Sequence, residues 1–144
     1  MGYRQVDISR KLVSARTATA VGRIRLTRKT VDLIRRGRIE KGDPLSLAKI
    51  TGIMAAKMTP ELVLLCHPLR IEGTTVEASL GPSGVEVSVT VSATEKTGVE
   101  MEALTGLLVA LLNVWDVVKA YEKDKKGQYP TTRIHDVQVL RKAK

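Results

Sequence analysis

The amino-acid sequence predicts an α+β fold of the ferredoxin-like class, in which helices pack on one face of an antiparallel sheet. The first observation is the order of the expected elements: strand, helices, strand, strand, helix, strand. This order is the split βαβ arrangement. The second is a hairpin in which valines alternate with polar residues, and the third is the long apolar helix that follows it. We expect residues 1–144 to form a single domain, because a chain of this length can enclose one core.

The first part of the chain predicts an arm, a strand and a short helix. Residues 1–15 show no regular pattern and predict an irregular N-terminal arm. Over 16–26, small or apolar residues alternate with polar ones, as expected for a strand that is buried on one face. Thr27 is a suitable N-cap for a helix over 28–37, and Gly37 is a typical helix end.

A second helix is predicted after Asp43. An Asp at the N-cap with Pro44 at the first helical position is a strong start signal, and the helix should run to about Met58 and stop before Pro60. An apolar stretch follows at 62–69. The small residues of the helix form a stripe suited to close packing on a sheet or on another helix: Ala48, Gly52, Ala55 and Ala56.

The clearest strand pattern belongs to a hairpin. Apolar and polar residues alternate over 75–80 and again over 85–92, and the turn between them is Gly-Pro-Ser-Gly at 81–84. The residues 127–130 break the helical pattern later in the chain, and 133–140 predict the last strand.

The longest apolar run, at 97–120, predicts the central helix. Thr97 followed three residues later by Glu100 predicts a capping box and a helix start at Thr97. The apolar residues recur every three or four positions, and we expect this stripe to be core: Leu104, Leu107, Leu108, Leu111, Leu112, Trp115 and Val118. Three polar residues interrupt the run and argue against a membrane span: Asn113, Asp116 and Lys119.

The formal net charge of +9 comes largely from two basic clusters, one between Arg23 and Lys41 and one at 119–126. This excess favours an anionic partner, either a phosphorylated small molecule or a nucleic acid. One Trp, three Tyr and no Phe are too few for a base-stacking platform, which weakens the nucleic-acid option. The first residues lack an apolar signal segment and the chain has one cysteine, so we expect a cytoplasmic protein.

Asp116 and Lys119 are the leading candidates for chemistry. They lie three positions apart near the end of the central helix, where a surface ion pair is the simpler interpretation. Partial burial among apolar neighbours would instead shift both pKa values and give a usable acid/base pair. Lys41 stands beside the start of the second helix, where it is equally consistent with an anion site and with a plain loop lysine.

A second set of candidates lies elsewhere in the chain. Glu102 in the first turn of the central helix has no capping role assigned to it, unlike Glu100. Cys66 is best interpreted as a small buried hydrophobe, and for His67 a structural role is at least as consistent as a catalytic one. The spacing of Cys66, His67 and His135 does not match a zinc site, so no metal site is expected.

The distance along the central helix separates the two sets. Glu102 and Asp116 are 14 positions apart, which is about 21 Å along a straight helix. They cannot both touch one small reacting group from the same chain. Either one of them is structural, or the substrate is long, or an oligomer brings the ends of different helices together.

Five motifs stand in order along the chain: Lys41-Gly42-Asp43, Ala48-x-x-Thr51-Gly52-Ile53-Met54-Ala55-Ala56-Lys57, Leu65-Cys66-His67-Pro68-Leu69, Thr97-Gly98-Val99-Glu100-Met101-Glu102-Ala103-Leu104-Thr105 and Trp115-Asp116-x-x-Lys119-Ala120. Together they closely resemble the molybdenum cofactor biosynthesis protein C family, the cyclic pyranopterin monophosphate synthases. The resemblance covers nearly the whole chain without a large insertion.

The resemblance implies a lyase that rearranges the cyclised dihydro-GTP, (8S)-3',8-cyclo-7,8-dihydroguanosine 5'-triphosphate, to cyclic pyranopterin monophosphate and releases pyrophosphate. It implies acid/base roles for Asp116, Lys119 and Lys41, without assigning the individual proton transfers. It also implies a phosphate contact for Arg16 and a set of residues that line the substrate pocket: Leu65, Cys66, His67, Met101 and Glu102.

The resemblance further implies a homohexamer, a trimer of dimers with active sites between subunits. No resident cofactor is expected, although Mg²⁺ can accompany the triphosphate. Trp115 stands where the family usually has Tyr, Val118 stands where it often has Cys, and the Gly- and Lys-rich tail of the family is missing. The alternative is a basic nucleotide- or nucleic-acid-binding module without catalysis.

Overall fold

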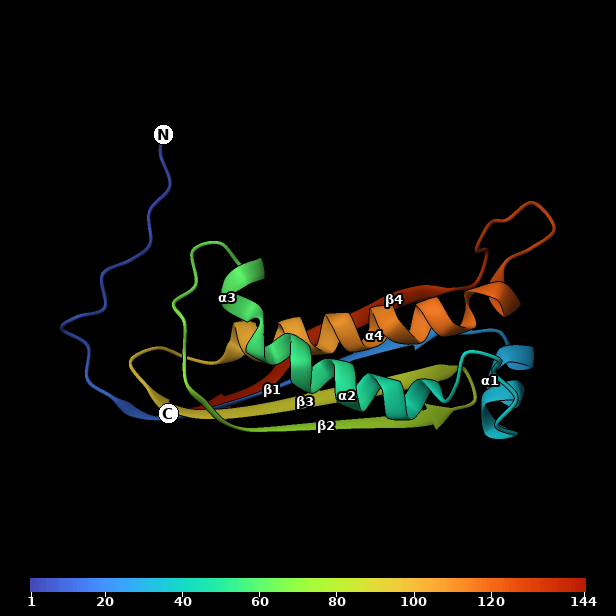
Figure 1. Cartoon of the computed structure of the whole chain (residues 1–144), viewed down its shortest axis with the longest axis horizontal. Helices are drawn as coiled ribbons and strands as arrows, with labels where there is room; N and C mark the ends of the chain where they lie inside the picture. The colour runs from blue at the N-terminus through green and yellow to red at the C-terminus, as the bar shows by residue number, and fades with distance from the viewer.

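The computed structural model describes residues 1–144 and contains a four-stranded antiparallel sheet in the order β2-β3-β1-β4, with the helices on one face (Figure 1). This order and the two helical crossovers confirm the predicted α+β ferredoxin-like class. In chain order the elements are β1 (Ser14–Arg25), α1 (Arg28–Arg35), α2 (Pro44–Lys57), α3 (Thr59–Leu62), β2 (Ile71–Gly81), β3 (Gly84–Glu95), α4 (Glu100–Glu122) and β4 (Arg133–Ala143).

The sheet buries the faces that the alternation predicted. In β1, Ala18, Ala20 and Ile24 are buried, and in β3 the valines from Val85 to Val91 are buried as well. β2 and β3 are joined by a two-residue loop, with Gly81 paired to Gly84. The predicted hairpin is therefore confirmed, including its turn.

Close packing of α2 on β2 and on α4 depends on glycine. A Cβ atom at Gly52 would lie 2.9 Å from a methyl group of Val76, and a Cβ atom at Gly106 would lie 2.8 Å from the carbonyl oxygen of Gly52. The small-residue stripe on α2 is buried as predicted, and it lets the two helix backbones approach. The N-cap of α2 is also confirmed, because the Asp43 carboxylate accepts hydrogen bonds from the backbone amides of Leu45 and Ser46.

The apolar stripe of α4 is only partly core. Leu107 and Leu111 are fully buried, but Leu108 and Leu112 are 44% and 59% exposed, so the prediction that the whole stripe is buried is wrong. The sheet covers one side of the helix and leaves these two leucines on the outer side. By length and composition alone α4 could cross a membrane, but 56% of its most apolar stretch is buried in this fold, as in the core helix of a soluble domain.

The start of α4 also differs from the prediction. The helix begins at Glu100, its N-cap is Val99, and no side chain caps it, so the capping box with Thr97 is wrong. Val99 is fully buried, and anchoring this apolar side chain in the core moves the N-cap two residues along the chain, from Thr97 to Val99.

The end of α2 is as predicted, whereas the start of β1 is not. α2 ends at Lys57 with Met58 as its C-cap, before Pro60, which lies in the first turn of the separate short helix α3. β1 already starts at Ser14, so the N-terminal arm is shorter than predicted.

Candidate functional site

Three charged side chains meet near the C-terminal end of α4. The Lys119 Nζ atom lies 2.9 Å from one carboxylate oxygen of Asp116, and the Lys41 Nζ atom lies 3.2 Å from the other. Asp116 and Lys119 come from α4, whereas Lys41 comes from the connection between α1 and α2. The structure thus brings together the three residues to which the family resemblance gives acid/base roles.

The electrostatics of this cluster come from pairing and not from burial. The hydrogen bonds from Lys119 and then Lys41 hold the pKa of the Asp116 carboxyl below its usual range, and the bond to Asp116 raises the pKa of the Lys119 ammonium. The side chains are 43% to 52% exposed, and burial opposes both pKa shifts instead of causing them, contrary to the prediction. In the resting protein the Asp116 carboxylate is therefore ionised, and Lys119 holds its proton across the neutral range.

We expect Asp116→Asn to shift the alkaline limb of the pH profile of kcat/KM to lower pH. The carboxylate stabilises the protonated form of Lys119, so its removal lets the lysine pKa fall toward the ordinary value of 10.5. The measurement is kcat/KM between pH 6 and about pH 11 for the wild type, Asp116→Asn and the exposed control Glu77→Gln. An unshifted alkaline limb in Asp116→Asn would contradict a role for protonated Lys119.

Glu102 and Cys66 lie close together near the other end of α4. The side chain of Glu102 is buried, with 2% of the residue exposed, and this burial raises the pKa of its carboxyl against an opposing hydrogen bond from its own backbone amide. Burial, and then the nearby charge of Glu102, raise the pKa of the Cys66 thiol. His67 is half-buried beside Cys66, whereas Leu65 and Met101 are exposed.

We expect Glu102→Gln to stabilise the fold at pH 8 by roughly 2–6 °C in Tm, and the gain to shrink as the pH falls toward the ordinary Glu value of 4.5. A raised pKa means that the folded state binds the proton more tightly than the unfolded state, so stability falls as the pH rises above 4.5. The amide removes that penalty. Thermal melts at pH 5 and pH 8 test this, with Glu77→Gln as the exposed control; a pH-independent difference would show that the carboxyl pKa is not raised.

Arg16 is engaged with the backbone at the end of the sheet. Its guanidinium donates to the carbonyl oxygens of Glu95 and Lys96 at 3.4 and 3.3 Å. These contacts fix the side chain beside the loop that leads into α4. The phosphate contact expected for Arg16 remains a prediction.

The two groups of residues stay apart within one chain. α4 is one uninterrupted helix, so Glu102 and Asp116 are about 21 Å apart along its axis. α3 packs beside the N-terminal half of this helix, whereas α1 lies at its C-terminal end (Figure 1). The Cys66 loop therefore belongs to one end of the molecule and Lys41 to the other.

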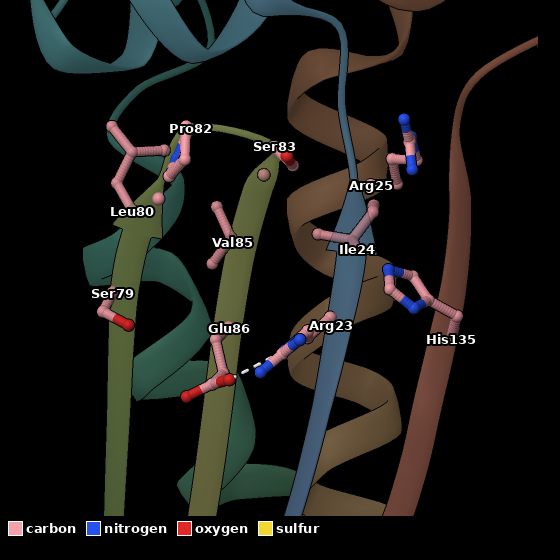
Figure 2. A pocket seen from close by; sticks show the side chains of 12 residues that line it. Arg23, Ile24, Arg25, Ser79, Leu80, Pro82, Ser83, Val85, Glu86 and His135 are labelled. Carbon is pink, nitrogen blue, oxygen red and sulfur yellow. Dashed lines mark hydrogen bonds and ion pairs between the residues drawn. The ribbon is translucent and has the colours of Figure 1, made fainter.

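A shallow pocket of about 490 Å³ lies at the hairpin end of the sheet and contains none of the predicted site residues. Figure 2 shows Arg23, Glu86 and His135 standing on the sheet surface, with Arg23 paired to Glu86 at 2.8 Å. Because Glu86 already neutralises Arg23, this positive charge is not free to bind an anion in the pocket. The structure also has no group of three or more His, Cys, Asp or Glu side chains arranged to hold a metal ion.

Sequence reasoning missed three residues around the charged cluster. Tyr129 packs edge-on against Trp115, with ring centroids 5.2 Å apart. Tyr121 contacts Glu40 in the connection between α1 and α2, and Glu122 contacts Thr27 at the start of α1. All three lie within or just beyond the basic stretch that ends α4, where the sequence carries no periodic signal to distinguish them from solvated residues.

The fold and the charged cluster define an α+β protein of the ferredoxin-like class with a lysine–aspartate–lysine site suited to acid/base chemistry. Comparison with known families gives a match to the MoaC family over residues 5–144, and the chain belongs to this family.

Three relatives illustrate the similarity. A protein from Pyrococcus abyssi and one from Pyrococcus horikoshii, both named "Probable cyclic pyranopterin monophosphate synthase", are each 54% identical over 99% of this chain and 90% of their own length. A relative from Methanothermobacter thermautotrophicus, 50% identical over the same shares, is named "Probable cyclic pyranopterin monophosphate synthase accessory protein".

Proposed function

We propose that this chain is a cyclic pyranopterin monophosphate synthase of molybdenum cofactor biosynthesis. It would convert (8S)-3',8-cyclo-7,8-dihydroguanosine 5'-triphosphate to cyclic pyranopterin monophosphate and release pyrophosphate, as a cytoplasmic lyase. The names of the relatives support this activity. The observation that carries it is the placement of the Lys41 and Lys119 ammonium groups on separate oxygens of Asp116.

The charged cluster suits the phosphate step of this reaction. Closing the cyclic phosphate forms a bond between a hydroxyl oxygen and the α-phosphorus and breaks the bond to the departing pyrophosphate. The hydroxyl proton passes to solvent water, and negative charge develops on the departing pyrophosphate. Lys119 is held in its protonated form and can donate a proton, while Lys41 offsets the charge and Asp116 orients both lysines.

The Cys66 end supplies the other half of the site in this proposal. Leu65, Cys66 and His67 on the loop, with Met101 and Glu102 on α4, would contact the pterin-forming part of the substrate, and Arg16 would contact its phosphates. The chain is not proposed to hold a resident cofactor. A magnesium ion would arrive with the triphosphate, which is its ordinary ligand.

The separation of the two ends supports a site shared between subunits. We infer a homohexamer, a trimer of dimers, in which the Cys66 end of one subunit meets the Lys119 end of another. The outer faces of α2 and α4 carry exposed apolar side chains that suit burial in such an assembly: Ile50, Met54, Leu108 and Leu112.

The test supplies the cyclised GTP intermediate, oxidises the product to a fluorescent pterin and quantifies pyrophosphate in the same reaction. We expect both products in equal amounts. Folded protein that gives neither product would overturn the proposal. Salt-sensitive binding of RNA or DNA without turnover would instead support a basic binding module.

A further inference from the structure

The last turn of α4 contains a buried carboxylate that the proposed chemistry does not use. Glu122 is 4% exposed, and none of its contacts is an ion pair with Lys or Arg. Its two oxygens accept hydrogen bonds from the Thr27 backbone amide at 3.1 to 3.2 Å, from the hydroxyls of Thr27 and Thr132 at 2.7 Å, and from the hydroxyl of Thr30. Burial of a carboxylate is costly unless donors surround it, and here four donors do so.

These donors come from two segments that are distant in sequence from each other. Thr27 is the N-cap of α1 and Thr30 lies in its first turn. Thr132 directly precedes β4. Glu122 therefore fastens the start of α1 and the start of β4 to the end of α4.

The neighbouring residue, Tyr121, makes a second contact between α4 and a distant segment, close to the charged cluster. The Tyr121 hydroxyl oxygen accepts a hydrogen bond from the backbone amide of Glu40 at 3.0 Å. Glu40 directly precedes Lys41. The connection that carries Lys41 lacks regular structure and has positive φ angles at Gly37 and Gly42, so its course depends on such contacts.

We propose that Tyr121 and Glu122 are positioning residues that hold the connection between α1 and α2 against α4, so that the Lys41 ammonium reaches Asp116. Glu122 fixes where α1 starts, and Tyr121 fixes the backbone next to Lys41. The importance of this for turnover rests on the proposed function, but the placement of Lys41 can be measured without any substrate.

The Asp116 carboxyl is the reporter for that measurement, because hydrogen bonds from Lys119 and Lys41 lower its pKa. Its titration is followed by NMR of the carboxyl carbon in the full-length wild type, Lys41→Ala, Tyr121→Phe and the double variant. We expect Tyr121→Phe to raise the Asp116 pKa in the same direction as Lys41→Ala, and to add nothing once Lys41 is absent. An unchanged pKa in Tyr121→Phe, or an equal rise with and without Lys41, would overturn the proposal.

Matched variants separate positioning from general damage. Tyr121→Phe removes one oxygen and keeps the ring, while Tyr3→Phe makes the same change in the exposed arm and should leave the Asp116 titration unchanged. Glu122→Gln should raise the pKa of the Asp116 carboxyl, as Tyr121→Phe does. If Glu122→Gln fails to fold, the tyrosine variant still decides the question.

Activity supplies the second readout. Tyr121→Phe should lower kcat/KM roughly three- to tenfold in the wild type but less than about twofold in Lys41→Ala, because the two changes act through one contact. Equal losses in both backgrounds would overturn positioning through Lys41. If the wild type shows no turnover, the proposed function fails, whereas the Asp116 titration still tests the positioning.

Discussion

Lys119→Ala is expected to lower kcat/KM by a factor of about 10²–10⁴, which is the usual contribution of a positioned acid or base. The ammonium lies 2.9 Å from Asp116, and its raised pKa keeps it protonated as a proton donor. The side chain is 43% exposed and outside the core, so the melting temperature should change by no more than about 3 °C. Initial rates with the cyclised triphosphate and thermal melts measure the two effects.

Two further variants define the role of Lys119. Lys125→Ala removes a lysine from the exposed loop after α4 and should keep wild-type activity. Lys119→Arg keeps the positive charge beside Asp116 but cannot release a proton near neutral pH, so it should remain strongly impaired. If Lys119→Arg were fully active, charge alone would account for the effect and proton donation would be excluded.

The sequence predicted the fold well where one local pattern decides the structure. The alternation in β1 and β3 and the Asp43–Pro44 start of α2 all appear in the structure. The predictions failed where the tertiary structure overrides a local signal. Burial of Val99 moves the start of α4, and the sheet covers only one side of the helix, which leaves Leu112 outside the core.

The pairing of β4 shows another limit of sequence reasoning. Its register on β1 shifts twice, and Asp136 adopts a φ of 54°, which is uncommon for a residue other than glycine. Bulges of this kind depend on the partner strand and leave no periodic pattern in the sequence.

In the candidate site, too, local spacing could be predicted from the sequence, whereas long-range contacts could not. Asp116 and Lys119 could be paired from their helical spacing, and the family motifs added Lys41, whose contact spans 75 positions of the chain. The contact between Glu122 and Thr27 spans 95 positions and has no helical or strand period to reveal it. A glutamate followed by lysines indicates a solvated surface, and only the three-dimensional structure shows that threonines enclose this one.

The separation of the two ends has a consequence for the oligomer. If each active site combined Lys119 of one subunit with His67 of another, the chain would have to associate before it could act. Six chains of 15.8 kDa would form a particle of about 95 kDa. A monomeric particle with full activity would contradict the shared site.

Mixing two inactive variants should therefore restore turnover. In a dimer of Lys119→Ala with His67→Ala, one site carries both defects and the other carries neither, so random assembly should recover about a quarter of wild-type activity. The two proteins are unfolded and refolded together in equal amounts, and the whole mixture is assayed without isolating the mixed species.

Mixing Lys119→Ala with Asp116→Ala supplies the matched control, because both changes affect the same end of α4 and leave every site in the mixture defective. Recovery in the first mixture and not in the second would require that the two ends of α4 act on the same substrate from different subunits. Mixed oligomers that stay inactive in both cases would place the whole site within one chain, and the substrate would then have to span the helix.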